Sequence, residues 1–238
     1  MNVNADRVVL ITGATGGLGR VVGATFAADG ARLGLVGTDV ERLTALATEL
    51  GLAADRWVPA VADLADPKAA HVAVDTVIER FGRVDVVLHL VGGWAGGTPV
   101  VDLDLDEVRS MIDQHLWTTL HVVQAAVPGM VERGWGRIVA VSTGFAANPA
   151  AKGGAYAVAK AAEETLVRAL AREVGATGVT ANVVVVKKID TAHERESDPS
   201  PKNATWTTPE EIAGVMCFLC SDDAAAINGA RIPLDGRG

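Results

Sequence analysis

Short apolar runs alternate with amphipathic stretches along almost the whole chain. The apolar runs are rich in β-branched residues, which is typical of strands that are buried in a sheet. They predict strands at Arg7–Ile11, Arg32–Val36, Trp57–Val61, Val84–Val91, Arg137–Val141, Val179–Val186 and Arg231–Leu234. The amphipathic stretches between them predict helices at Leu18–Asp29, Val40–Leu50, Lys68–Phe81, Asp106–Glu132, Tyr156–Val174 and Pro209–Cys220.

This alternation predicts an α/β fold. We expect residues 1–238 to form a single doubly wound, Rossmann-type domain, with a central parallel sheet of about seven strands and helices on both faces. The sequence contains no Pro- or Ser-rich linker and no internal repeat. One long polar segment, 187–208, has no predicted element of its own, and its length indicates a functional loop, which we assign to the substrate.

Composition and charge narrow the class of partner. The chain is 49% hydrophobic and has a net charge of −8. An acidic protein repels phosphate backbones, so nucleic acid is not expected as a partner. No apolar run approaches the roughly 18 residues that a membrane span requires, and no secretory signal opens the chain, so we predict a cytoplasmic protein without a membrane partner. The histidines lack the paired spacing of metal ligands, so no metal is expected.

A glycine-rich turn lies between the first predicted strand and the first predicted helix. It reads TGATGGLG from Thr12 to Gly19. Glycines allow a tight turn and a close approach of the backbone to a pyrophosphate, and the following helix presents free N–H groups and a positive dipole end. Glycine-rich turns are common, but this place in the fold is where dinucleotides bind. The candidate phosphate-binding residues are Gly13, Thr15, Gly16, Gly17, Leu18 and Gly19.

Tyr156 and Lys160 lie four residues apart and therefore on one face of a predicted helix. A phenol has a pKa of about 10, and a neighbouring ammonium favours the phenolate and lowers that pKa. The tyrosine can then give a proton to a carbonyl oxygen or take one from an alcohol. Tyr156 is the only tyrosine in the chain, which favours a catalytic role over a chance match.

The Gly-x-x-x-Gly-x-Gly spacing and the Tyr-x-x-x-Lys pair together resemble the short-chain dehydrogenase/reductase family. The resemblance covers essentially all 238 residues and includes the tail Asn228–Gly236. It implies NAD(P)(H)-dependent hydride transfer between nicotinamide and a small ketone or secondary alcohol. It also implies that Tyr156 handles the proton and that Lys160 holds the ribose hydroxyls. Two other functions stay open: reduction of a 3-oxoacyl thioester, and a nucleotide-binding sensor or scaffold with little turnover.

The resemblance also implies further site residues. The family's catalytic serine stands thirteen positions before the tyrosine, and that position is Thr143 here, next to Ser142. Either hydroxyl can hydrogen-bond the reacting oxygen, although both can equally satisfy the backbone at a strand end. Cofactor contacts are implied after the third, fourth and sixth strands, at Asp63, Leu64, Val91, Gly92, Gly93, Ile189 and Thr191.

The chain departs from the family pattern at three places. His115 replaces the asparagine of the long helix, counted thirteen residues back from Pro128. An imidazole can relay protons to Lys160 through water; alternatively, the histidine is a structural replacement and the relay is weaker. The other two departures are His89-Leu90-Val91 in place of the family's Asn-Asn-Ala and Val186-Lys187 in place of its Pro-Gly.

The residues after the second strand bear on the choice of nucleotide. An acid there holds the ribose 2′-OH of NAD, and a basic residue accommodates the 2′-phosphate of NADP. The matching positions are Gly37 and Thr38, and Gly16 replaces the basic residue that many NADP-dependent relatives carry. Asp39 is favoured as a helix cap over a ribose ligand. The lack of an acid at Gly37 favours NADP slightly.

Apolar side chains on two predicted helices exceed what packing on the sheet requires. They include Trp117 and Leu120 on the first helix, and Leu166 and Leu170 on the second. The resemblance implies that these helices pair about two-fold axes, so we expect a homo-oligomer, a tetramer. The alternative is that the segment 187–206 covers this surface.

Overall fold

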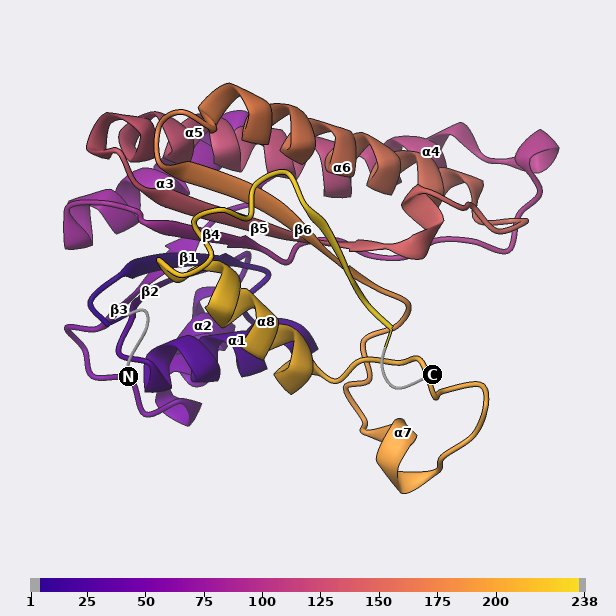
Figure 1. Cartoon of the computed structure of the whole chain (residues 1–238), viewed down its shortest axis with the longest axis horizontal. Helices are drawn as coiled ribbons and strands as arrows, with labels where there is room; N and C mark the ends of the chain where they lie inside the picture. Colours follow the sequence, from indigo (N-terminus) through magenta and orange to yellow (C-terminus); the bar gives the residue numbers. More distant parts are fainter. Residues whose placement is uncertain (1–4, 236–238) are drawn as a thin grey trace.

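Strands and helices alternate in the computed structural model, which describes residues 5–235 (Figure 1). The strands are β1 Val8–Thr12, β2 Arg32–Gly37, β3 Trp57–Val61, β4 Val86–His89, β5 Gly136–Thr143, β6 Val179–Val186 and β7 Arg231–Leu234. The helices are α1 Gly17–Ala28, α2 Val40–Glu49, α3 Pro67–Phe81, α4 Leu105–Ile112, α5 Thr118–Arg133, α6 Gly154–Val174, α7 Glu194–Ser197 and α8 Pro209–Leu219. Short helical turns complete the set: η1 Val100–Asp102, η2 Asp113–Trp117 and η3 Gly144–Ala146. The family-like tail extends to Gly236, which lies outside the described residues.

Within residues 5–235, the strands form one parallel sheet in the order β3-β2-β1-β4-β5-β6-β7. β1 pairs with both β2 and β4, so the winding of the chain reverses between β1 and β4. In doubly wound sheets, ligands bind outside the carboxyl ends of the strands at this reversal. The predicted doubly wound α/β fold is confirmed.

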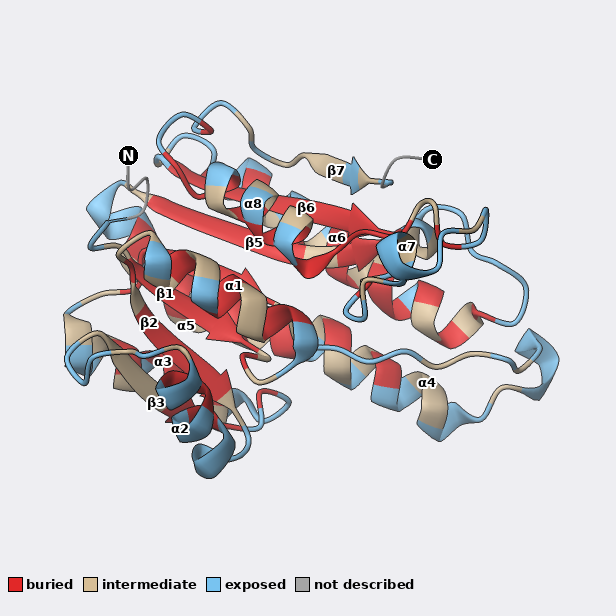
Figure 2. Ribbon diagram, turned by 90° about the horizontal axis from the view of Figure 1, so that it is seen from below, coloured by how far each residue is buried: buried red, intermediate tan, exposed pale blue. Residues whose placement is uncertain are grey.

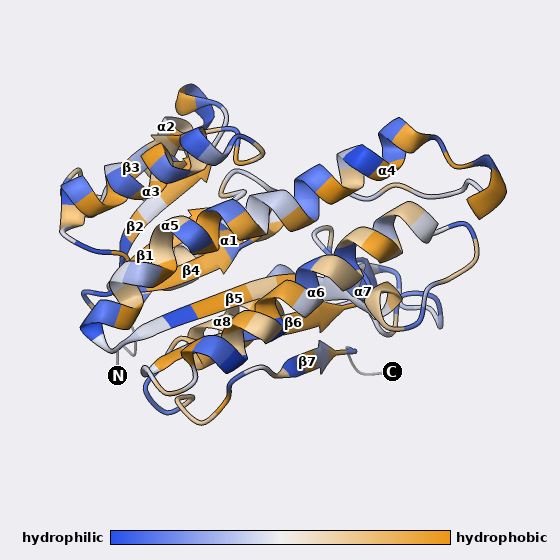
Figure 3. Cartoon of the chain, turned by 90° about the horizontal axis from the view of Figure 1, so that it is seen from above, coloured by the Kyte–Doolittle hydropathy of each residue, from blue (hydrophilic) through white to orange (hydrophobic). Residues whose placement is uncertain are grey.

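Helices cover both faces of the sheet because side chains alternate along each strand. In β1, Val8 and Leu10 pack toward α3, α5 and α6, whereas Val9 and Ile11 pack toward α1, α2 and α8. Figure 2 shows β5 and β6 buried between the two layers, and Figure 3 shows that these strands are hydrophobic along most of their length. The packing of this core holds the carboxyl ends of the strands in place, and the candidate site residues lie at these ends.

Two predicted elements differ from the structure. The helix predicted over Asp106–Glu132 is divided into α4, the π-helical turn η2 and α5. Such π turns are frequent at functional sites, and this one carries His115. The strand predicted at Val84–Val91 is shorter, because Leu90 and Val91 leave the sheet and line a cavity.

The segment 187–208 contains structure of its own. It holds the short helix α7 and a bridge between Ile189 and Thr207. It lies on the side of the sheet that carries α1 and α8, so it does not cover the outer faces of α5 and α6 (Figure 1). Among the helices of residues 5–235, none combines the length and apolarity that a membrane span needs.

Candidate active site

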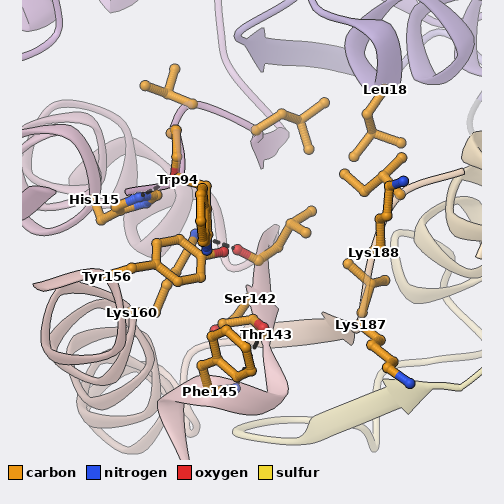
Figure 4. Close-up of a pocket in the computed structure, with 17 residues that line it drawn as sticks. Leu18, Trp94, His115, Ser142, Thr143, Phe145, Tyr156, Lys160, Lys187 and Lys188 are labelled. Carbon is orange, nitrogen blue, oxygen red and sulfur yellow. Dashed lines mark hydrogen bonds between the residues drawn. The ribbon is translucent and has the colours of Figure 1, made fainter. Parts of the chain in front are cut away.

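The predicted catalytic side chains meet in one cavity of about 420 Å³ at the carboxyl ends of β4, β5 and β6. Figure 4 shows His115 and Tyr156 on one side of this cavity, with Lys187 and Lys188 opposite them. The departure Val186-Lys187 therefore belongs to its wall. The predicted site residues that line it are Leu18, Val91, Gly92, Gly93, His115, Ser142, Thr143, Tyr156, Lys160 and Ile189.

A second cavity, of about 620 Å³, adjoins the first, because Val91 lines both. One part of its wall comes from α4 and η2, which was not expected from the sequence. It includes Arg109, whose guanidinium lies 2.8 Å from the carboxylate of Asp106. Joined cavities at the reversal of the winding and beside the catalytic side chains give the layout that a dinucleotide needs. The predicted nucleotide contacts in the second cavity are Gly13, Thr15, Gly37, Thr38, Asp63 and Leu64.

The glycines of the first turn are required by the turn itself. Gly13 has a φ of +65°, and a Cβ there would lie 3.0 Å from the carbonyl oxygen of Leu90. A Cβ at Gly19 would overlap the Gly13 carbonyl oxygen, and one at Gly17 would lie 2.8 Å from the Thr191 side chain. The turn is therefore compact and docked on the segment after β6, and the N-cap residue of α1, Gly16, has no side chain to cap the first N–H groups of the helix. The predicted cofactor residues that line neither cavity are Gly16, Gly17, Gly19, Asp39 and Thr191.

Tyr156 and Lys160 share one face of α6, as expected. The Lys160 ammonium donates to the carbonyl oxygen of Val141 at 2.7 Å and to the carboxylate of Glu163 at 2.6 Å. Burial raises the pKa of Tyr156 to about 12, the charge of Glu163 adds to this rise, and a hydrogen bond with Thr143 opposes it. The expected lowering of the Tyr156 pKa by Lys160 is wrong for this arrangement, because burial of the phenol and then the charge of Glu163 raise that pKa.

Glu163 is the residue that the sequence analysis missed. Its side chain is 1% exposed, and burial raises its pKa. The second carboxylate oxygen accepts a hydrogen bond from the Thr119 hydroxyl at 3.4 Å. One signal was present: Tyr156, Lys160 and Glu163 stand at i, i+4 and i+7, so they lie on the same face of a helix.

Thr143 and Ser142 are neighbours on β5, and successive residues of a strand point to opposite faces. The Thr143 side chain lines the same cavity as Tyr156 and acts to lower the pKa of Tyr156, and its hydroxyl accepts from the backbone N–H of Phe145 at 3.4 Å. The Ser142 hydroxyl is buried and has no hydrogen-bond partner within the described part of the chain. The geometry therefore favours Thr143 as the hydroxyl that joins Tyr156 at a reacting oxygen.

His115 enters the site from η2. Its Nε2 lies 3.0 Å from the Gly93 carbonyl oxygen, and its ring meets Tyr156 edge-on with the centroids 5.5 Å apart. Its Nδ1 has no hydrogen-bond partner within residues 5–235 and lies 3.9 Å from a Glu163 carboxylate oxygen. Burial, and then the charge of Lys160, lower the pKa of His115 to about 4, so the ring is neutral at neutral pH.

His89 has a structural task. Its two ring nitrogens lie 3.1 Å from the Thr12 hydroxyl and 3.2 Å from the Thr118 hydroxyl. These contacts join β1 to the start of α5, and the Thr12 hydroxyl in turn accepts from the N–H of Leu90. Complete burial lowers the pKa of His89 to about 3. This departure from the family pattern therefore holds the strand ends together beneath the cavity.

Asp39 caps a helix, as favoured by the sequence. Its carboxylate accepts from the backbone N–H groups of Glu41 at 2.9 Å and Arg42 at 3.1 Å, at the start of α2. Gly37 and Thr38, by contrast, line the second cavity. The end of β2 therefore presents no carboxylate to this cavity from any of the three positions.

Comparison with known proteins agrees with this fold. Residues 7–202 match the family described as short chain dehydrogenase. The chain is 30% identical to a D-threitol dehydrogenase of Mycolicibacterium smegmatis, over 97% of this chain and 92% of that protein. It is also 30% identical to an A-factor type gamma-butyrolactone 1′-reductase of Streptomyces virginiae, over 97% and 95% of the two chains. The crystal structure of a levodione reductase superposes with a TM-score of 0.88 at 28% identity, covering 98% of this chain and 97% of that one.

The parallel sheet with its cavities at the strand ends thus defines a Rossmann-type oxidoreductase. The chain belongs to the short chain dehydrogenase family, whose members act on CH–OH or C=O groups.

Proposed function

We propose that this protein catalyses reversible hydride transfer between the nicotinamide of NAD(P)(H) and a ketone or secondary alcohol. One observation carries the proposal. The side chains of Tyr156 and Thr143 line one cavity, which adjoins a second cavity at the sheet reversal. A substrate oxygen beside both hydroxyls would lie in the first cavity, and a dinucleotide would extend through the second.

The nucleotide, when bound, donates or accepts the hydride; the side chains of this protein handle the proton. In reduction, Tyr156 gives its hydroxyl proton to the carbonyl oxygen while the carbon receives the hydride, and the product is the alcohol. In oxidation, the phenolate takes the alcohol proton. Thr143 donates a hydrogen bond that orients the oxygen and stabilises its developing charge. Lys160, already fixed by two hydrogen bonds, keeps a third N–H for a ribose hydroxyl or for Tyr156.

The residues present fit a dinucleotide. Gly13 and Gly19 form a cradle that a Cβ would fill, and α1 begins directly behind it. The family-implied contacts Asp63, Leu64, Val91, Gly92 and Gly93 line the two cavities. Because Asp39 is engaged as a cap and Gly37 has no side chain, the end of β2 offers no carboxylate to repel a 2′-phosphate, which favours NADP.

The experiment is a panel of small ketones and secondary alcohols assayed with each nucleotide. The panel should include polyols, cyclic diketones and a 3-oxoacyl thioester. We expect steady turnover of at least one ketone or alcohol. Saturable nucleotide binding with no turnover of any member would refute the proposal and favour the sensor. Turnover confined to the thioester would favour 3-oxoacyl thioester reduction.

We also propose that the protein is cytoplasmic and assembles as a homotetramer through α5 and α6. Of the apolar side chains on these helices, Val123, Val127, Met130 and Val174 are buried against the sheet within one chain. Trp117, the last residue of η2 and directly before α5, is however 41% exposed. The segment 187–208 does not cover this side of the molecule (Figure 1). We therefore propose that a second copy of the chain covers it, in an assembly with closed two-fold symmetry.

A further inference from the structure

The carboxylate of Glu163 contacts the lysine on which the proposed function depends. Its oxygen lies 2.6 Å from the Lys160 ammonium, and the Glu163 and Lys160 side chains are 1% and 7% exposed. Breaking a buried ion pair of this kind leaves an uncompensated charge, so the two groups are held together. A second Lys160 N–H is fixed on the Val141 carbonyl oxygen, which leaves one of three donors for Tyr156 or a ribose.

Other charged and titratable groups surround the pair. On η2, the neutral ring of His115 turns its unpartnered Nδ1 toward Glu163 at 3.9 Å. On α6, Glu164 adds a second carboxylate, but it is paired with Arg231 of β7 at 2.8 Å. On β4, burial and then the charge of Lys160 lower the pKa of His89, so its ring is neutral. Glu163 is therefore the group that sets the net charge behind Tyr156.

We propose that Glu163 is a positioning residue that cancels the charge of Lys160 and keeps the proton on Tyr156, which sets this site for carbonyl reduction. The inference rests on the proposed function. A lone ammonium would promote loss of the phenol proton. Burial of the phenol, and then the charge of Glu163, oppose that effect of the ammonium, and Glu163 lies one further turn along the same face of α6. A protonated Tyr156 is the form that reduction requires, because the carbonyl oxygen takes its proton from the hydroxyl as the carbon takes the hydride.

The chain allows a direct test, because Tyr156 is its only tyrosine. Near-ultraviolet absorbance of tyrosinate therefore reports this residue alone, with no substrate or nucleotide. We expect Glu163→Gln, which keeps a hydrogen-bond acceptor for Lys160, to lower the ionisation midpoint by about one pH unit, so that the tyrosinate fraction at a given alkaline pH rises about tenfold. Glu164→Gln is the matched control, since it removes a buried carboxylate one residue away, and Glu163→Asp should restore the wild-type value.

Measurements are compared at the highest pH at which circular dichroism shows every variant folded. For substrates found in the panel, the rising limb of alcohol oxidation should move to lower pH in Glu163→Gln by the same interval, and the falling limb of ketone reduction should move with it. An unchanged tyrosinate fraction in Glu163→Gln, or an equal change in Glu164→Gln, would overturn the inference. Because the titration requires no turnover, its failure and the failure of the proposed function are seen separately.

Discussion

Removing the carboxylate of Asp39 should destabilise the fold and leave nucleotide binding unchanged. The side chain accepts two backbone hydrogen bonds at the start of α2, at 2.9 and 3.1 Å, and lines neither cavity. Loss of such a cap costs about 1 kcal/mol. In a chain of this length, that corresponds to a fall of about 2–4 °C in the Tm. We therefore expect Asp39→Ala to unfold earlier in a thermal scan and to bind each nucleotide with a Kd within about twofold of the wild-type value.

Two variants make this test specific. Asp39→Ser keeps a capping oxygen without the charge, so it should recover most of the stability. Asp66 caps α3 in the same way, accepting from Lys68 at 2.8 Å and Ala69 at 3.4 Å, so Asp66→Ala should show the same thermal loss. A nucleotide Kd raised tenfold or more in both Asp39 variants, but not in Asp66→Ala, would refute the cap and make Asp39 a ribose ligand.

Three further predictions concern other parts of the molecule. Gly37→Asp places a carboxylate at the second cavity, with its Cβ 3.3 Å from the Leu43 side chain, so titration should show NADP affinity lowered at least about tenfold relative to NAD. The pKa of His89 is about 3 in the fold against its ordinary 6.5, so the unfolded chain alone gains this proton as the pH falls below about 6.5. Urea unfolding should therefore show stability falling from pH 7 to pH 5, less steeply in His89→Asn. Light scattering after size exclusion should give about four times the chain mass of 24.6 kDa; a mass near 24.6 kDa would refute the tetramer.

The fold was predictable because buried parallel strands have a simple sequence signature. Val179–Val186 is mostly apolar and forms β6 with the predicted bounds. The same signature overextended the fourth strand, since Leu90 and Val91 are apolar for a different reason: they line the cavity. Apolarity alone does not distinguish a side chain buried in the core from one that lines a binding site.

The site could be predicted where its residues follow a fixed spacing. Tyr156 and Lys160 share a helix face by geometry, and the count back to Thr143 identified a hydroxyl that lines the same cavity as the tyrosine. The π turn around His115 could not be predicted, because the hydrophobic periodicity of one such turn differs little from that of an α-helix. Glu163 was missed because a carboxylate on a helix is expected in solvent, and its burial depends on packing against another helix.

The central claim is that the Tyr156 hydroxyl moves the proton in a nicotinamide-dependent reaction. Tyr156→Phe tests it most directly, because the ring keeps its edge contacts with His115 and Phe145 while only the hydroxyl is lost. The measurement is kcat with the best substrate of the panel, beside nucleotide titration of the same sample. The account predicts a nearly unchanged nucleotide Kd and a kcat lowered on the order of 10²–10⁴-fold. A wild-type kcat in this variant would contradict it.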